Sequence, residues 1–356
     1  MDTGKRIAIL GWLDSVHVQR WARGLAERGF VVKVFSLGGA DRDGIDAAIF
    51  PRSGTYSYFS QAGGVARALS EFRPDLVHAH YATGFGLWML RSKIRPRIVS
   101  VWGSDVIEFP ADPFRRFLIR RVLNGADHIT ATSKLLKRVT ENLVPDRSER
   151  ISVIPFGVEL PLSHVPMPAL PPARLCFIKV HYKKYGPDIL LRAVKLARET
   201  VPDIKLTMAG EGEMTPMLQN MTAELGLEDT VSFVGFIDNR EIYDFIRQHH
   251  MMIMPSVMES ESFGVAVLEA GACGRAVIAS DIGGVPEVLD DGRTGLLVPP
   301  GDVGRLAEAI VKLATDADLC RDMGRQGYRF VSENYDWQKS LDAMADLYLR
   351  LIDRRG

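Results

Sequence analysis

The sequence predicts an α/β protein built from two Rossmann-like, doubly wound domains. Short segments rich in β-branched residues alternate with helical patterns along both halves of the 356-residue chain. Such alternation indicates parallel sheets covered by helices. A proline-rich segment separates the two halves, and the chain length suits about two domains of roughly 150 residues each.

The first half opens with a strand at Arg6–Leu10 and continues with a helix. Val18, Trp21 and Leu25 recur there at helical spacing, and Gly29 stands where a glycine commonly ends a helix. Further strands are expected at Val31–Phe35, Leu76–His80, Arg97–Trp102, His128–Thr132 and Ile151–Ile154.

The segment Pro155–Pro172 contains six prolines. It can form neither a continuous helix nor a central strand, so we expect an interdomain linker. The second half then repeats the alternation and ends in a helix. Its strands are expected at Leu175–Val180, Ile204–Ala209, Val231–Val234, Met251–Met254, Ala276–Ala279 and Gly295–Val298, and the helix at Ser340–Ile352.

These elements predict domains at 1–165 and 173–337, with residues 338–356 packing back on the first domain. Two doubly wound domains facing across a cleft would bind a ligand at the C-terminal ends of their strands.

Composition excludes several classes of function. The 44 basic and 44 acidic residues balance, so no bulk attraction to nucleic acid is expected. Cys176, Cys273 and Cys320 are widely spaced, which predicts neither disulfides nor a zinc site. The longest apolar runs are too short for a transmembrane helix or a signal peptide. We therefore expect a cytoplasmic protein.

The most informative segment follows the strand that ends at Met254. An acidic loop leads to a helix that opens near Gly264 and has Glu269 in its second turn. Free amides at a helix start attract anions, and a glycine lets a phosphate approach the backbone. Glu261 and Glu269 flank that position, and carboxylates suit the vicinal hydroxyls of ribose or a hexose. Helix capping is the alternative role for these acids.

The run Glu261-Ser262-Phe263-Gly264-x4-Glu269 resembles the signature of the family 4 retaining glycosyltransferases, which have the two-domain GT-B fold. The resemblance covers nearly the whole chain. It implies that Glu269 binds the ribose hydroxyls, that Glu261 lies beside the transferred sugar, and that the amides after Phe263 face the donor. Further matching segments are Ala209–Glu213, Val231–Gly235, Pro255-Ser256, Gly283–Glu287 and Gly292–Val298. The implied donor-binding residues are Gly11, Lys179, Lys184, Gly210, Phe236, Glu261, Ser262, Phe263, Gly264, Val265 and Glu269.

The family places two cations near the donor diphosphate, and the matching residues are Lys179 and Lys184. The usual pattern is Gly-Arg followed by Lys-Gly, whereas here Tyr185 separates Lys184 from Gly186. Lys183 is therefore an alternative to Lys184. Two cations and a helix start can neutralise a leaving diphosphate without a metal, so no cofactor or metal is expected. The sequence Asp41-Arg42-Asp43 is interpreted as a surface loop.

The first half is expected to bind the acceptor. Gly11 follows the first strand without forming a dinucleotide-binding fingerprint, and a plain tight turn is its alternative role. His80 ends a strand and is a candidate to hydrogen-bond sugar or phosphate; His78 is a weaker one. Asp105, after the strand that contains Trp102, either orients the acceptor hydroxyl or caps the next turn. The expected catalytic residues are Glu261, Lys179, Lys184, His80 and Asp105.

A basic amphipathic helix is expected around Arg115–Arg121, where four arginines alternate with apolar residues. It would lie on anionic lipid at the membrane surface, bind an anionic acceptor, or simply present a solvated arginine face.

The resemblance implies retaining transfer of a hexosyl group from a nucleotide-diphosphate sugar to a saccharide, a lipid-linked acceptor or a small molecule. The expected donor is a UDP-sugar. The alternatives are a GDP-mannose-dependent mannosyltransferase, a nucleotide-sugar epimerase or phosphorylase on a similar fold, and a non-catalytic sugar-binding protein.

Overall fold

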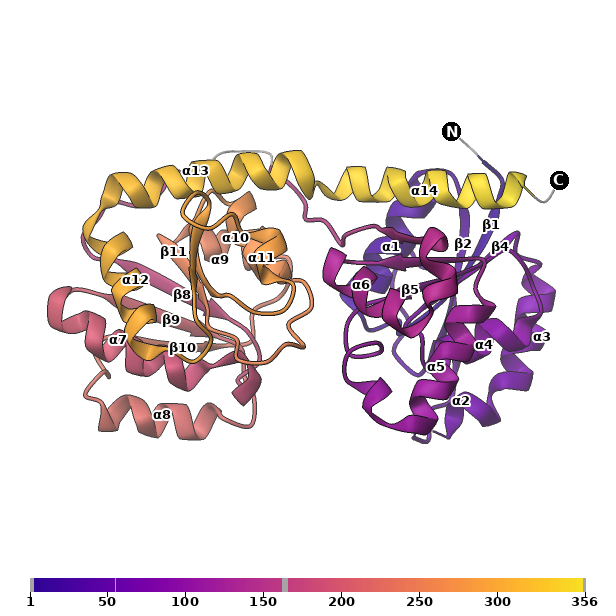
Figure 1. The fold of residues 1–356 in the computed structure, drawn as a ribbon, viewed down its shortest axis with the longest axis horizontal. Coiled ribbons are helices and arrows are strands. Elements are labelled where there is room, and N and C mark those ends of the chain that lie inside the picture. Colours follow the sequence, from indigo (N-terminus) through magenta and orange to yellow (C-terminus); the bar gives the residue numbers. More distant parts are fainter. Residues whose placement is uncertain (1–2, 55, 162–165, 355–356) are drawn as a thin grey trace. The chain divides into compact units, whose positions relative to one another are not determined.

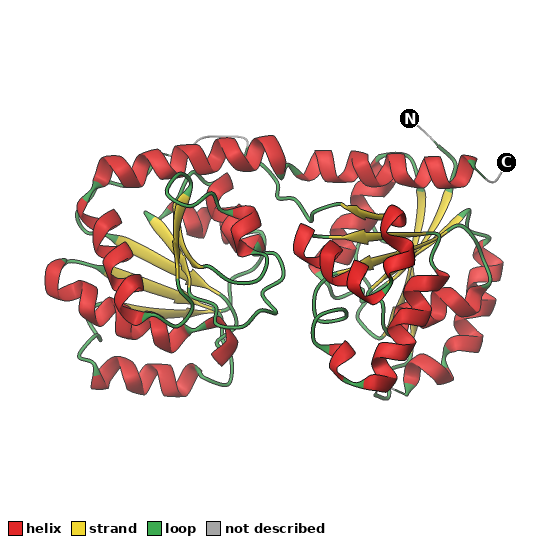
Figure 2. Cartoon of the chain, viewed as in Figure 1, coloured by secondary structure: helices red, strands yellow, loops and turns green. Residues whose placement is uncertain are grey.

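The computed structural model describes residues 3–54, 56–161 and 166–354. The chain forms two compact units, Met1–Phe156 with Gln338–Gly356, and Gly157–Trp337 (Figure 1). Each unit is a parallel sheet with helices around it, as Figure 2 shows by secondary structure. The predicted α/β class is confirmed.

The first unit contains a seven-stranded parallel sheet in the order β3-β2-β1-β4-β5-β6-β7. The order reverses direction between β1 and β4, which is where doubly wound sheets place their ligands. The strands are β1 (Arg6–Leu10), β2 (Val31–Leu37), β3 (Ala47–Phe50), β4 (Leu76–His80), β5 (Arg97–Val101), β6 (His128–Ala131) and β7 (Ile151–Val153).

Strand β3 was not predicted from the sequence. It has four residues, lies at the edge of the sheet and is only partly buried, so it lacks the continuous apolar run of a central strand. The predicted strands are all present, with ends that differ by one or two residues.

Helices α1 (Val16–Glu27) and α14 (Trp337–Asp353) pack together in the first unit. A Cβ on Gly24 of α1 would meet the Leu341 side chain of α14 at 2.6 Å, and Arg28 pairs with Asp342 at 2.7 Å. The amide of Gly29 donates to the Ala26 carbonyl at 2.9 Å, as expected for a glycine that ends a helix. The other helices are α2 (Ser57–Ser60), α3 (Ala62–Phe72), α4 (Gly84–Ser92), α5 (Pro113–Gly125) and α6 (Lys134–Leu143).

The second unit contains a six-stranded parallel sheet in the order β10-β9-β8-β11-β12-β13, and its order reverses between β8 and β11. The strands are β8 (Arg174–Ile178), β9 (Lys205–Ala209), β10 (Val231–Gly235), β11 (Met251–Met254), β12 (Ala276–Ser280) and β13 (Gly295–Val298). The helices are α7 (Pro187–Thr200), α8 (Thr215–Glu224), α9 (Ile242–Arg247), α10 (Val265–Ala272), α11 (Val285–Val288), α12 (Val303–Thr315) and α13 (Ala317–Asn334).

The boundary between the units lies at Phe156/Gly157, whereas the sequence placed the end of the first domain at residue 165. Val158 forms a bridge with Asp336, and its carbonyl accepts from the Trp337 amide at 2.9 Å. These bonds tie residues after 156 to the second unit. Residues 162–165, within the predicted linker, and the last two residues of the predicted segment 338–356 lie outside the described structure.

Candidate active site

An ion pair joins two of the expected site residues at the switch point of the second sheet. Lys179 follows β8 and Glu261 lies in the loop after the neighbouring strand β11. Lys179 Nζ lies 3.1 Å from Glu261 Oε2, and Ser256 Oγ donates to the same carboxylate oxygen at 3.2 Å. Because parallel neighbours end at the same edge, residues separated by 82 positions meet there.

The charge of Lys179 is stabilised by acidic neighbours. Burial by itself would lower the pKa of Lys179, but the charge of Glu261 and then Tyr185 act in the opposite direction. The hydrogen bond to Glu261 and the charge of Glu269 add to them, so the pKa lies above its usual value. Lys179 is therefore a fixed cation, and Glu269 is close enough to act on it.

Tyr185 contacts the side chains of both expected lysines. The Nζ atoms of Lys179 and Lys184 lie 4.7 Å and 5.0 Å from the centre of the Tyr185 ring. Cations at such distances are attracted by the negative face of the ring. Lys183 is exposed, so the geometry favours Lys184 over Lys183 as the second cation. The inserted Tyr185, a departure from the family pattern, contacts both ammonium groups.

Two glycines hold the loop of Glu261 by close backbone contact. The Gly284 amide donates to the Glu261 carbonyl at 2.9 Å. A Cβ on Gly283 would lie 2.2 Å from that carbonyl oxygen, and one on Gly284 would lie 2.1 Å from the Ser262 oxygen. Only glycine permits this approach, so the Gly283-Gly284 pair positions the acidic loop. The sequence showed the pair as part of the resemblance, without this function.

Gly186 joins the lysine loop to the acidic loop. Its φ is +63°, and a Cβ there would lie 2.1 Å from the Pro255 carbonyl oxygen. The Val257 amide donates to the Lys184 carbonyl at 2.8 Å. The loop that contains Lys184 therefore packs directly on the loop that leads to Glu261.

Helix α10 begins beside these loops. Gly264 precedes its first residue with φ +84°, and no side chain in the described structure caps its N-terminus. Phe263 is buried, Ser262 and Val265 are half-buried, and Glu269 lies in the second turn. The first amides of the helix can therefore bind an anion by donating hydrogen bonds to it.

Gly210 and Phe236 border the same strand ends. The Gly210 amide donates to the Gly235 carbonyl at 2.7 Å, and a Cβ on Gly210 would lie 2.1 Å from the Lys179 carbonyl oxygen. Phe236, directly after β10, is 78% exposed. Gly210 thus lies next to Lys179, and Phe236 presents an open aromatic ring to solvent at the end of the neighbouring strand.

In the first unit, His80 ends β4 as predicted. It is 1% exposed, and neither ring nitrogen has a hydrogen-bond partner within the described structure. Its ring centre lies 4.5 Å from that of His78 and 4.8 Å from that of Trp102. Burial, followed by the nearby charge of His17, lowers the pKa of His80 to about 3. His80 is a neutral imidazole whose polar atoms are available.

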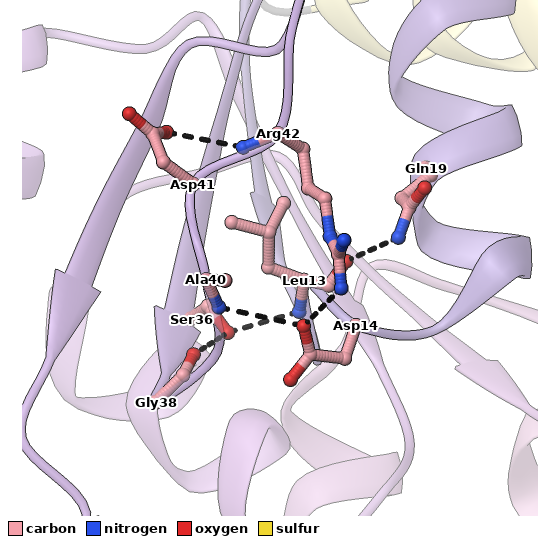
Figure 3. A network of polar contacts seen from close by, with 8 residues as sticks. All are labelled: Leu13, Asp14, Gln19, Ser36, Gly38, Ala40, Asp41 and Arg42. Carbon is pink, nitrogen blue, oxygen red and sulfur yellow. Dashed lines mark hydrogen bonds and ion pairs between the residues drawn. The ribbon is translucent and has the colours of Figure 1, made fainter.

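Gly11 lies against His80 at the first switch point. A Cβ on Gly11 would lie 3.5 Å from the His80 Cβ and 2.9 Å from Val18 Cγ2, so the contact requires glycine. The following loop is braced by a polar network (Figure 3). The Leu13 amide donates to Ser36 Oγ at 2.9 Å, and Asp14 pairs with Arg42 at 2.8 Å. Arg42 of the Asp41-Arg42-Asp43 segment thus stabilises this loop.

Asp105 has a different position from the one expected of a residue that contacts the acceptor. It is fully buried and accepts the backbone amides of Ala82 at 2.9 Å, Trp102 at 3.1 Å and Gly103 at 3.0 Å. Burial raises its pKa, against the lowering effect of these bonds. The structure makes Asp105 a positioning residue that ties together the loops after β4 and β5.

His78 is also structural. Its Nδ1 lies 2.6 Å from the Tyr348 hydroxyl and its Nε2 lies 2.7 Å from Ser100 Oγ. The bond to Tyr348 fastens α14 to the centre of the first sheet. Sequence reasoning left His78 as a weak candidate and did not find Tyr348, which lies 270 positions away.

A cavity of about 680 Å³ opens at the strand ends of the first unit. Its walls are largely aromatic and include Trp12, His17, Tyr58, Tyr81, Thr83 and Trp102. Trp102 also packs on His80. These residues were not predicted as a group, because they come from five separate loops and helices.

Metal ligands are not gathered in the described parts of the chain. Among residues 3–54, 56–161 and 166–354, no three His, Cys, Asp or Glu side chains stand close enough to hold an ion. Nor does any helix described here have the length and apolar character needed to cross a membrane.

Two doubly wound parallel-sheet domains, with cations, acids and a helix start at the strand ends of the second, define the class of GT-B glycosyltransferases. Residues 6–133 match the family model for glycosyl transferase 4-like proteins, and residues 168–330 match that for glycosyl transferases group 1. The chain belongs to the group 1 glycosyltransferases, enzymes that transfer sugars from nucleotide-sugars.

Known proteins agree with this membership. The N-acetyl-alpha-D-glucosaminyl L-malate synthase of Bacillus anthracis is 28% identical over 79% of this chain and 77% of its own. The GDP-mannose-dependent alpha-(1-6)-phosphatidylinositol monomannoside mannosyltransferase of Mycolicibacterium smegmatis is 29% identical over 70% of this chain and 69% of its own. The structure of Anabaena Alr3699/HepE in complex with UDP superposes with a TM-score of 0.81 at 18% identity, covering 98% of this chain and all of that one.

Proposed function

We propose that the second unit binds the nucleotide-sugar donor at the ends of β8 and β11. The observation that supports this most strongly is the Lys179–Glu261 pair, 3.1 Å long and placed beside the uncapped start of α10. A diphosphate has about two negative charges, and Lys179, Lys184 and the helix amides would neutralise them together. Both lysines contact Tyr185, and Lys179 pairs with the loop that leads into α10, so we propose that one diphosphate reaches all of these groups.

The acids on either side of this position would bind hydroxyl groups. Glu269 sits one turn into α10, where its carboxylate would accept hydrogen bonds from the ribose. Glu261 would accept from the transferred sugar once the diphosphate takes over Lys179. Phe236, exposed at the end of β10, would stack on the base. Gly210 allows the Lys179 backbone to pack directly against it.

The proposed reaction is retaining transfer. The bond from sugar C1 to the diphosphate oxygen breaks, and the acceptor oxygen bonds to C1 on the same face. The acceptor proton passes to the departing diphosphate. Lys179 and Lys184 stabilise the charge that grows on this leaving group, and such preorganised charges commonly contribute the largest share of catalysis.

His80 is proposed to bind a hydroxyl of the transferred sugar or the acceptor. Its ring is neutral because burial holds the pKa of His80 at about 3, so it has one donor and one acceptor nitrogen. Both nitrogens lack partners in the described structure, and a buried polar group without a partner costs about 1–3 kcal/mol. A ligand hydroxyl would remove that cost.

A UDP-sugar is the proposed donor, and the HepE structure in complex with UDP supports it through the shared fold. A GDP-mannose donor is the alternative that the mycobacterial relative supports. We further propose that the acceptor is a saccharide, free or lipid-linked, and that transfer takes place in the cytoplasm or at the membrane facing it, without a metal.

Thermal shift against a panel of UDP- and GDP-sugars tests the donor, because a ligand that binds the folded state raises the melting temperature. The expected result is a shift with one UDP-sugar that is lost in Lys179→Met. NMR of the product anomer then tests retention, and activity in EDTA tests metal independence. An inverted anomer, or activity abolished by EDTA and restored by Mg²⁺, contradicts the respective part of the proposal.

A further inference from the structure

Helix α5 exposes two large aromatic side chains among its arginines. Phe114 is 66% exposed and Phe117 is 61% exposed, whereas Ile119, Val122 and Leu123 on the opposite face are buried. The buried face of the helix therefore packs against its own domain without these two rings. An ordinary solvated helix face would show the arginines alone, so the exposed rings need a separate explanation.

Among the residues that the structure describes, no acidic side chain forms an ion pair with the arginines of α5. The helix, PFRRFLIRRVLNG, contains four arginines and no aspartate or glutamate. Within the described chain, no ion pair or hydrogen bond is formed by the guanidinium groups of Arg116, Arg120 and Arg121. Arg115 lies over the Phe109 ring at 5.5 Å. This face thus combines unneutralised positive charge with exposed apolar rings.

A groove of about 1070 Å³ runs along this face between α2, α4 and α5. The labels in Figure 1 locate these three helices. Its positive lining comes from Arg91, Arg116, Arg120 and Arg121, and its apolar lining from Phe59 and Phe117. Phe59 of α2 is 44% exposed and Tyr56 beside it is 74% exposed. The exposed aromatic residues therefore extend from α5 to α2.

The groove adjoins the aromatic cavity at the strand ends. Tyr58, Phe59 and Leu118 line both. The cavity continues from them to Thr83 and Trp102, and Trp102 packs on the ring of His80. The groove and the cavity are therefore neighbours, and we refer to the two together as the path from the arginines of α5 to the loops that we propose for the acceptor.

We propose that this path binds a lipid-linked acceptor: a saccharide joined through a phosphate or diphosphate to a prenyl or acyl chain in a membrane. The saccharide lies in the aromatic cavity, and the phosphate group lies on the groove arginines Arg91, Arg116, Arg120 and Arg121. The exposed rings of α5 and α2 enter the lipid interface. Guanidinium groups match phosphate oxygens in geometry and charge. This inference rests on the proposed function, because it names the acceptor of the same site.

The combination of arginines and exposed aromatic rings favours a lipid-linked acceptor over a soluble one. A soluble anionic saccharide would use the arginines and leave the exposed ring of Tyr56, which lines neither the groove nor the cavity, in water. Basic amphipathic helices with aromatic residues lie in membrane interfaces, where rings enter the boundary and arginines meet anionic headgroups. A lipid-linked phosphate uses both features at once.

Vesicle sedimentation with the full chain tests the inference. Three kinds of vesicle are compared: phosphatidylcholine alone, phosphatidylcholine with a prenyl diphosphate, and phosphatidylcholine with phosphatidylglycerol of equal charge. The expected result is tightest binding to the prenyl diphosphate vesicles. The triple variant Arg116→Gln, Arg120→Gln, Arg121→Gln should bind these vesicles about 100-fold more weakly, because each arginine is expected to contribute a factor of about five to the affinity. The double variant Phe114→Ser, Phe117→Ser should lose at least about tenfold.

A matched control removes the same charge elsewhere. Arg305, Arg321 and Arg325 are exposed on α12 and α13 and paired with acids in their own helices, so their triple glutamine variant should bind vesicles as the wild type does. Equal binding to prenyl diphosphate and phosphatidylglycerol vesicles overturns the inference, since it shows attraction to any anionic surface. Wild-type vesicle binding by the Phe114→Ser, Phe117→Ser variant, together with full competition by inorganic pyrophosphate, also overturns it, because the site would then bind soluble anions without any contribution from the rings.

Donor binding separates this inference from the proposed function. The α5 variants should keep the wild-type thermal shift with nucleotide-sugar, because they lie outside the donor-binding unit; this result also shows that they fold. A donor shift without vesicle binding rejects the lipid-linked acceptor alone. Vesicle binding without any donor shift rejects the proposed donor site instead.

Discussion

Lys179 and Glu261 form an ion pair with 3.1 Å between Nζ and Oε2, and Ser256 also bonds to that carboxylate. The pair is mostly buried, with 22% and 9% of the two side chains exposed. It places one positive and one negative charge at the mouth of the proposed donor site before any ligand arrives. Binding a diphosphate would exchange the partner of Lys179 rather than bring an unpaired lysine out of water.

Replacing Lys179 by methionine should therefore reduce both stability and catalysis. It leaves Glu261 with a buried charge and one bond fewer, which costs about 1–3 kcal/mol in the free energy of unfolding. It also removes a charge opposite the leaving diphosphate, which should lower kcat about 100- to 1000-fold. Urea denaturation and steady-state kinetics measure the two effects. The double variant with Glu261→Gln should recover stability without recovering kcat, and recovery of both would contradict the role of Lys179.

The neighbouring lysines provide an internal comparison. Lys184→Met should lower kcat at least about tenfold because it removes one of the two charges against Tyr185. Lys183→Met removes the same charge one residue earlier, from an exposed side chain, and should leave kcat nearly unchanged. The reverse order of effects in steady-state kinetics would assign the diphosphate to Lys183.

Glu269 should affect donor affinity more than turnover. Loss of the hydrogen bonds that its carboxylate would accept from ribose should weaken UDP binding about 10- to 100-fold in Glu269→Ala, since bonds to charged groups contribute about 1.5–3 kcal/mol. Calorimetric titration with UDP measures this directly. Glu308→Ala, exposed on α12, is the control. Unchanged UDP affinity in Glu269→Ala would place the ribose elsewhere.

The buried histidines predict a pH dependence of stability. Burial holds the pKa of His80 at about 3 and that of His17 at about 4 in the folded protein, below the usual 6.5. The unfolded chain therefore binds protons that the folded chain does not, so stability is full above pH 6.5 and falls as the pH drops toward 4. Within this window, each histidine lowers the free energy of unfolding by about 1.4 kcal/mol for every unit that the pH falls.

Chemical denaturation at several pH values between 7 and 4 measures that slope. The variant His80→Asn should lose the contribution of one histidine and show a shallower decline. A slope identical to that of the wild type would mean that His80 is protonated in the folded protein.

The close contact at Gly284 predicts a defect from one added methyl group. Gly284→Ala would place Cβ 2.1 Å from the Ser262 oxygen, and the loop of Glu261 must move to make room. We expect a lower melting temperature and a lower kcat, measured by calorimetry and kinetics. Gly304→Ala, in α12 with its nearest neighbour at 3.5 Å, should be neutral or stabilising by up to about 1 kcal/mol. Normal kcat in Gly284→Ala would show that the contact does not position the loop.

The sequence by itself determined the two α/β halves, nearly every strand, the start of α10 near Gly264 and the run from Glu261 to Glu269. These features follow from local periodicity, helix starts and glycine positions, which read directly along the chain. The edge strand β3 was not predicted from the sequence, because a partly buried strand has no continuous apolar run.

Only the tertiary structure decided which residues meet. Glu261 and Lys179 come together because β8 and β11 are neighbours in the sheet, and Tyr348 reaches His78 because α14 packs on the first unit. The tertiary structure also buries Asp105, where it supports two loops. It brings together the residues of the aromatic cavity from separate elements. Strand order and burial are long-range properties of packing, and local sequence does not contain them.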